Sequence, residues 1–167
     1  MTDLVPHAQV APFPCAVGNE LQQHYIDGGF RPSRSGMTFE SLNPTTNRVL
    51  ACAAAGDAAD VDAAVRAARQ AFDRSEWRHL SAQDRAAVLR RIAGAIRSHA
   101  DGFIAREVAD IGMPISQMKG LAARAAQNFE YYAGVVTELH GRSFQVADEF
   151  LNYTIRKPVG VAGLIMP

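Results

Sequence analysis

The last ten residues, PVGVAGLIMP, constrain the fold more than any other stretch of the sequence. Residues 159–166 carry no charge and hardly a polar atom, which is typical of a strand buried on both faces of a parallel sheet. A buried strand needs neighbouring strands, and no residue follows Pro167 to supply them. The pattern therefore predicts the first strand of a sheet whose other strands this sequence does not encode.

Four stretches between residues 57 and 140 predict amphipathic helices, because their apolar residues recur at spacings of three and four. Asp57, Ser81 and Ser116 are candidate caps at helix starts, and Gly112 and His140-Gly141 are stop signals. Ser81 and Asp84 form a capping-box pattern, in which the Asp84 carboxylate is expected to reach back to a backbone amide. The expected apolar faces are Val61, Val65, Ala68 and Phe72; Val88, Leu89, Ile92 and Ile96; Phe103, Ile104, Val108 and Ile111; and Met118, Leu121, Ala125, Phe129, Tyr132 and Val136.

Three short hairpins are also predicted. The first surrounds Asp27-Gly28, a dipeptide that adopts the positive φ angles of a tight turn. The second joins residues 38–42 to residues 48–53 through the turn formers of residues 43–47. The third joins residues 143–147 to residues 150–157, where apolar and polar side chains alternate. A two-stranded ribbon is barely stable alone, so the third hairpin is expected to join another sheet.

Charge and cysteine content exclude several classes of protein. Lys plus Arg and Asp plus Glu are both 17, without a charge run, so we expect neither a nucleic-acid partner nor a membrane surface. Cys15 and Cys52 lack Cys-x-x-Cys spacing and cannot form a disulfide framework, which fits a reducing cytosol better than secretion. The first 20 residues read as neither a signal peptide nor a transit peptide. A cytoplasmic location is therefore expected.

Motifs that carry chemistry are absent from the sequence. There is no glycine-rich phosphate loop, no His-x-x-x-His, no Cys/His cluster and no nucleophile elbow. Gly160 and Gly163 form the pattern GVAG, but a third glycine and a following helix are missing, so close packing of a strand explains them better than dinucleotide binding. The residues alone therefore predict a helical domain with hairpins and one isolated strand.

Six segments nevertheless occur in the order and spacing of a known family: "YIDGGF", "NPTTNRVLACAAAGDAADVDAAVRAARQAF", "LSAQDRAAVLRRIAGAI" after a Trp, "EVADIGMP", "FEYYAGVVTELHG" and "RKPVGVAGLIMP". From about residue 24 to residue 167, the chain resembles the amino-terminal third of the NAD(P)-dependent aldehyde dehydrogenases. In that family the next two residues would be Trp-Asn, and the sequence would continue for some three hundred residues. The resemblance thus identifies the chain as a fragment.

The resemblance implies a partial α/β fold of the aldehyde dehydrogenase type. Residues 1–22 would be a flexible tail, and residues 23–141 the amino-terminal helical part of the cofactor-binding domain. Residues 142–157 would be a β-hairpin through which these enzymes form dimers and tetramers. Residues 158–167 would be the first strand of a truncated Rossmann-like sheet. The exposed hairpin and strand would be an aggregation hazard in the isolated chain.

Site residues follow from the same resemblance. Ile165, Met166 and Pro167 match the strand end that lines the cleft for NAD or NADP, although a purely structural strand is an equal alternative. Arg124 and Asn128, with Gly120 and Gln127, match the helix face that lines the aldehyde tunnel, and a charge there would favour a polar or acidic aldehyde. A solvated Arg124 is the simpler alternative. Asp110 matches an acidic residue of a monovalent-cation site, but a structural role at a helix end explains it better.

Two functions remain open from the sequence. The first is an amino-terminal fragment of an aldehyde dehydrogenase, which oxidises a small-molecule aldehyde to a carboxylic acid through a cysteine thioester. The family's nucleophilic cysteine and glutamate base lie beyond Pro167, so this chain alone is expected to be inactive. The alternative is a non-catalytic helical interaction module that docks on a full-length aldehyde dehydrogenase. A module that stands alone should have lost the exposed apolar run of residues 159–166, so the presence of this run favours the fragment.

Overall fold

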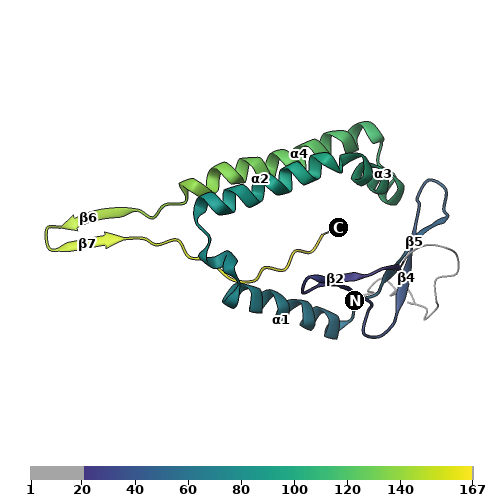
Figure 1. Ribbon diagram of the computed structural model, residues 1–167, viewed down its shortest axis with the longest axis horizontal. Helices are drawn as coiled ribbons and strands as arrows, with labels where there is room; N and C mark the ends of the chain where they lie inside the picture. The colour runs from purple at the N-terminus through teal and green to yellow at the C-terminus, as the bar shows by residue number, and fades with distance from the viewer. Residues whose placement is uncertain (1–20, 167) are drawn as a thin grey trace, which may run out of the picture. The chain divides into compact units, whose positions relative to one another are not determined.

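The computed structural model describes residues 21–166, which form two compact units (Figure 1). The described part of unit 1 is residues 21–68 and 106–113, and that of unit 2 is residues 69–105 and 114–166. The tail predicted for residues 1–22 lies outside the described residues except for its last two. Among the described residues, no helix is long and apolar enough to cross a membrane.

Unit 1 contains two small sheets. Strands β1 (Leu21–Gln22), β5 (Val49–Ala54) and β4 (Thr38–Leu42) form one sheet in that order. The pairing of β4 with β5 is antiparallel and confirms the second predicted hairpin, whereas the parallel strand β1 was not expected. Strands β2 (His24–Ile26) and β3 (Gly29–Arg31) form the first predicted hairpin. Its turn residues Asp27 and Gly28 have φ angles of 56° and 75°, as a two-residue turn of this kind requires.

Helix α1 (Ala58–Arg74) begins in unit 1, and helix α3 (Ala100–Ile111) ends there. Asp57 caps α1 as predicted, because its Oδ1 accepts the backbone N–H groups of Ala59 at 2.8 Å and Asp60 at 3.1 Å. Gly112 ends α3 with a φ of 75°, and a Cβ at this position would lie 2.8 Å from Pro44 Cγ. Both the positive φ and this close approach require glycine, so the predicted stop signal is confirmed.

Helices α2 (Ala82–Ser98) and α4 (Ile115–Val135) form the centre of unit 2, where α4 returns alongside α2 in the opposite direction (Figure 1). Their buried residues are small: Ala86 and Ala93 on α2, and Ala126 and Ala133 on α4. Each pair is spaced by seven residues, so each marks one stripe along its helix. Alanine stripes allow two helices to approach closely.

The expected large apolar faces are only partly buried. Met118 and Ile104 are buried, but Ile92, Leu121 and Tyr132 are exposed. On α1, Val61 and Val65 also lie exposed. The prediction that the large side chains form the buried faces was therefore wrong for these residues. On α2 and α4 it is mainly alanines that are buried.

The helix caps differ from the sequence prediction at two positions. Ser81 caps α2 as predicted, and its Oγ accepts the N–H of Asp84 at 3.1 Å. The Asp84 carboxylate, however, accepts the Ser81 hydroxyl at 2.7 Å, so it does not reach back to a backbone amide. Ser116 was wrongly predicted as the cap of α4. The helix starts at Ile115 after Pro114, whose fixed φ suits a helix start and which has no side-chain acceptor.

The third hairpin consists of β6 (Ser143–Ala147) and β7 (Phe150–Tyr153), which pair antiparallel (Figure 1). At its base, the Thr154 N–H donates to the Arg142 carbonyl at 2.7 Å, and the Arg142 N–H donates to Thr154 Oγ1 at 2.9 Å. A Cβ on Gly141 would lie 1.9 Å from the Thr154 carbonyl oxygen, so this position requires glycine. The prediction of a strand up to residue 157 was too long, because β7 ends at Tyr153.

The strand predicted for residues 159–166 is not formed in the structure, where this segment has no regular secondary structure. Its apolar side chains lie in solvent, and the exposed fractions of Val159 and Ile165 are 106% and 98%. A strand is held by hydrogen bonds to a neighbouring strand, and no described residue supplies one beside this segment. The apolar run is therefore an unpartnered segment within the described part of the chain.

Candidate functional site

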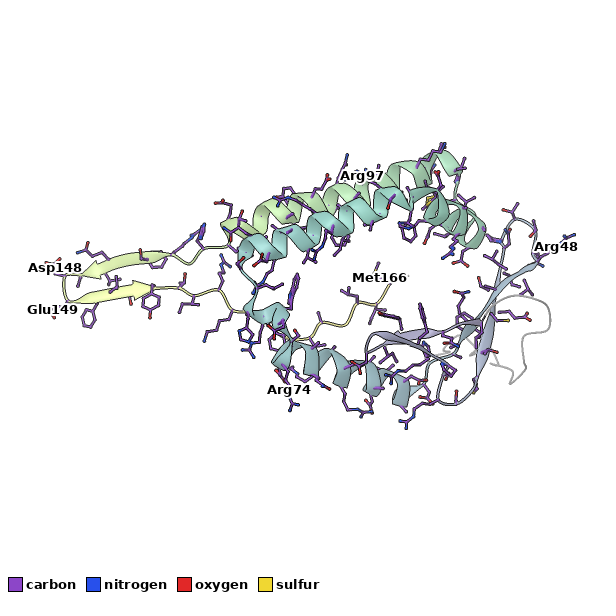
Figure 2. All side chains as sticks on the ribbon, viewed as in Figure 1. Arg48, Arg74, Arg97, Asp148, Glu149 and Met166 are labelled. Carbon is purple, nitrogen blue, oxygen red and sulfur yellow. The ribbon has the colours of Figure 1, made fainter. Side chains whose placement is uncertain are left out.

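The residues predicted to line the cofactor cleft do not form a cleft by themselves. Ile165 and Met166 are exposed in the irregular carboxyl-terminal segment, and Figure 2 shows Met166 near its end. Pro167 lies outside the described residues. The described residues here include no glycine turn and no helix start that would hold a pyrophosphate, so they do not fit NAD or NADP on their own. The cofactor role of these three residues stays a prediction.

The residues predicted for the aldehyde tunnel form a polar strip on α4. Gly120, Arg124 and Asn128 are each four residues apart, so they lie on one face of the helix. All three are exposed, and a Cβ on Gly120 would meet no atom within 4 Å. Among residues 21–166, no hydrogen bond or ion pair involves the side chain of Arg124 or of Asn128. The strip therefore presents one guanidinium and one amide that can bind a polar ligand group.

Asp110 has a structural partner within unit 1. Its Oδ1 accepts a hydrogen bond from Ser41 Oγ of β4 at 2.5 Å. This bond joins the end of α3 to the β4–β5 sheet, as does the close approach of Gly112 to Pro44. Within residues 21–166, no group of three His, Cys, Asp or Glu side chains could hold a metal ion. Asp110 thus has the partner expected of a structural residue.

A buried polar cluster surrounds Asp60 on α1, and no sequence pattern had pointed to it. Asp60 is 6% exposed, and its carboxylate accepts Ser33 Oγ at 3.0 Å, the Arg34 N–H at 3.1 Å and the Asp57 N–H at 3.1 Å. His24 Nε2 lies 3.9 Å from Asp60 Oδ2. The two aspartates at one helix start, Asp57 and Asp60, could have indicated a polar cluster. Its other members, Ser33 and His24, are distant in sequence, so spacing could not identify them.

These contacts lower the pKa of the Asp60 carboxyl below its ordinary value of 3.8. The largest cause is the hydrogen bond from the Asp57 backbone, and those from Arg34 and Ser33 and the nearby His24 add to it against the opposing effect of burial. Each donor favours the ionised form. The cluster therefore holds a charged carboxylate, which ties the loop at Ser33 and Arg34 and strand β2 to the start of α1.

We expect the Asp60 cluster to make stability depend on pH in the acid range. Because the folded-state pKa lies below the unfolded-state value, the ionised carboxylate stabilises the fold above about pH 4, and this contribution is lost as the pH falls through the folded-state pKa. Thermal melts between pH 3 and pH 6 should show a steeper loss for the wild type than for Asp60→Asn. Asp62→Asn, on the exposed side of α1, is the matched control and should follow the wild type. Parallel curves for wild type and Asp60→Asn would contradict this assignment.

A second ion pair joins the two central helices of unit 2. Arg97 of α2 donates through Nη1 and Nη2 to the two carboxylate oxygens of Glu130 on α4, the Nη2 bond measuring 2.7 Å. This pairing lowers the pKa of Glu130 and raises that of Arg97, the hydrogen bonds being the largest cause of each shift. Both side chains are half exposed, so the pair fixes the orientation of the helices more than it stabilises them.

The described residues do not combine a nucleophile with a base. Cys52 lies in β5 and is 1% exposed, so a substrate cannot reach it, and Cys15 lies outside the described residues. What the structure does offer is the polar strip on α4, which could recognise a substrate. A role of this strip in substrate recognition stays a prediction.

Comparison with known proteins gives a consistent match. The family model described as "Aldehyde dehydrogenase family" matches residues 30–167. A putative aldehyde dehydrogenase of Bacillus subtilis, DhaS, is 41% identical over 144 residues, which cover 86% of this chain and 29% of the relative. The 5-carboxymethyl-2-hydroxymuconate semialdehyde dehydrogenase of Escherichia coli is 40% identical over 130 residues, which cover 77% of this chain and 27% of that protein.

Solved structures of the same family also match most of this chain but only a part of their own length. The NAD+ complex of an aldehyde dehydrogenase from Bacillus cereus matches with a TM-score of 0.81 at 33% identity, and the match covers 84% of this chain and 29% of that one. The chain thus spans less than a third of the length of each of these three relatives.

Proposed function

The chain belongs to the aldehyde dehydrogenase family, and from this premise we propose that it is the amino-terminal part of an enzyme that oxidises an aldehyde to a carboxylic acid. The observation that carries the proposal is the match over residues 30–167 together with α/β structural neighbours of the same family. The structural neighbours include NAD-dependent enzymes and an NAD+ complex, which supports NAD or NADP as the hydride acceptor of the whole enzyme.

The proposed reaction needs groups that the described residues, 21–166, do not bring together. In the family, a cysteine thiolate attacks the aldehyde and the resulting thioester is hydrolysed, so nucleophile, base and cofactor must be positioned together. Cys52 is buried, and the described residues do not bring a base to an accessible cysteine. We therefore propose that the chain alone does not oxidise aldehydes. A cytoplasmic location and assembly of the whole enzyme into dimers or tetramers stay predictions.

Sequencing the gene beyond codon 167 tests the proposal and separates it from the interaction module. An in-frame continuation that begins with Trp-Asn is expected, and the product of that longer frame should form NADH or NADPH when an aldehyde is added. The chain of 167 residues should form neither. A stop codon directly after Pro167 in the intact gene, with no oxidation by the purified chain, would favour the module instead.

We further propose that Arg124 selects an acidic aldehyde. The guanidinium is exposed and without a partner among the described residues, and Asn128 lies one turn away on the same helix face. A guanidinium binds a carboxylate through two parallel hydrogen bonds. The name of the Escherichia coli relative describes a carboxylated semialdehyde, which supports a substrate of this class here.

The substrate proposal predicts a selective loss in the longer enzyme. Arg124→Ala should lower kcat/KM for an acidic aldehyde by at least about tenfold, because the charge-assisted hydrogen bonds to the carboxylate are lost, and leave a neutral aldehyde unchanged. Arg90→Ala, an exposed arginine on α2, is the matched control and should change neither rate. Equal rates for both aldehydes in the wild type, unaltered by Arg124→Ala, would end the proposal.

A further inference from the structure

The polar strip on α4 lies about half a turn around the helix from the buried residues of α4. Two further amides, Gln117 and Gln127, lie on the same side of the helix as Gly120, Arg124 and Asn128, and both are exposed. This side of α4 is therefore rich in hydrogen-bonding groups, but Arg124 is its one charged residue.

The charge of Arg124 has no carboxylate on its own helix to pair with. Exposed helix faces commonly carry opposite charges three or four residues apart, and α1 does so, with Arg69 Nη1 lying 3.7 Å from Asp73 Oδ1. The only acidic residue of α4 is Glu130, and both of its carboxylate oxygens already accept hydrogen bonds from Arg97 of α2. The strip therefore suits a ligand that brings its own anionic group to the guanidinium.

The Asn128 amide lies within reach of a ligand that is held by Arg124. Residues four positions apart on a helix have their Cβ atoms about 5–6 Å from each other. The amide offers one acceptor oxygen and two N–H donors, and a hydroxyl group can satisfy either kind because it both donates and accepts. On the other side of Arg124, Gly120 has no side chain, and a Cβ there would meet no atom within 4 Å. That turn of the helix therefore leaves space for the carbon chain of a ligand.

We propose that Asn128 binds a hydroxyl group of the substrate whose carboxylate Arg124 binds, so that the whole enzyme acts on hydroxylated acidic aldehydes. This inference rests on the proposed function and makes its substrate class narrower. A substrate without the hydroxyl leaves the amide unpaired when water is excluded, and an unpaired polar group disfavours that substrate. Asn128 is thus a second specificity residue, which acts separately from Arg124 because the two side chains bind different groups of the aldehyde.

Two acidic aldehydes that differ by one hydroxyl test the role of Asn128 in the enzyme encoded by the longer reading frame. The plain probe is glutaric semialdehyde, and the hydroxylated probe is its derivative with a hydroxyl on the carbon next to the aldehyde. The wild type should oxidise the hydroxylated probe with a kcat/KM at least about fivefold higher than that of the plain probe. Asn128→Leu should remove this preference by lowering kcat/KM for the hydroxylated probe alone. Arg124→Ala, by contrast, should lower kcat/KM for both probes.

Gln83→Leu removes an exposed amide from α2 and is the matched control, which should keep the wild-type ratio of the two rates. Calorimetric titration with the two product acids, glutarate and its hydroxylated derivative, measures the same preference without the reaction. An unchanged rate ratio in Asn128→Leu, or equal dissociation constants of the two acids for the wild type, would overturn the inference and leave the proposed function standing. If the longer enzyme oxidised no aldehyde, the proposed function would fail, and the titration would still decide the role of Asn128.

Discussion

Replacing Ala126 by leucine is expected to destabilise unit 2 by about 1–3 kcal/mol, because the larger side chain forces α4 away from α2. Ala126 is 0% exposed, and α4 packs against α2, whose own buried residues are Ala86 and Ala93. The three added carbon atoms have no free volume at this contact. Urea denaturation followed by circular dichroism should show a lower midpoint with a similar slope.

The matched control is Ala123→Leu, on the exposed side of the same helix. Alanine and leucine have similar helix propensities, so this change should leave the free energy of unfolding within about 0.5 kcal/mol of the wild type. Equal midpoints for Ala126→Leu and Ala123→Leu would show that the two helices do not pack through their alanine stripes.

Replacing Gly141 by alanine is expected to open the base of the third hairpin. The new Cβ would lie 1.9 Å from the Thr154 carbonyl oxygen, well inside the contact distance of the two atoms, so the backbone must move. The movement breaks the hydrogen bonds between Arg142 and Thr154, a local cost of about 2–4 kcal/mol. Hydrogen exchange at the amides of Arg142 and Thr154 should accelerate at least about thirtyfold.

Gly134→Ala is the control for this change. Gly134 lies in α4, and a Cβ at this position would meet no atom within 4 Å, so alanine should stabilise the helix by about 0.5–1 kcal/mol. Unchanged exchange at Thr154 in Gly141→Ala would show that the hairpin base is looser than the structure indicates.

Local signals predicted most of the elements. These signals act within a few residues of their own position. In the structure Asp57 caps α1, and Asp27-Gly28 and Gly112 adopt the positive φ angles that their turns require. The order of the four helices followed from apolar spacing for the same reason. Ser116 failed as a cap because Pro114 occupies the cap position two residues earlier.

Packing was harder to predict than periodicity. Spacing shows which residues share a helix face, but it does not show which part of that face meets a neighbour. Apolar spacing therefore assigned the buried face of α2 to residues such as Ile92, whereas Ala86 and Ala93 lie at the contact with α4. Alanine carries a weak apolar signal, and its close packing depends on the matching alanines of the partner helix.

The candidate site residues were likewise predictable only where local spacing determines their position. The shared face of Arg124 and Asn128 follows from helical spacing, but its role as a tunnel wall came from the family resemblance and still needs the substrate test. The cluster around Asp60 was missed because its donors Ser33 and His24 are distant in sequence. Such a site forms only when the loop, the strand and the helix start are folded together.

Hydrogen exchange of residues 159–166, followed by mass spectrometry, tests the central claim most directly. This apolar run has no neighbouring strand among the described residues, so its amides in the 167-residue chain should exchange at nearly the rate of an unfolded peptide. In the product of the longer reading frame, the same amides should be protected by the rest of the parallel sheet. Strong protection of these residues in the isolated, monomeric chain would contradict the account.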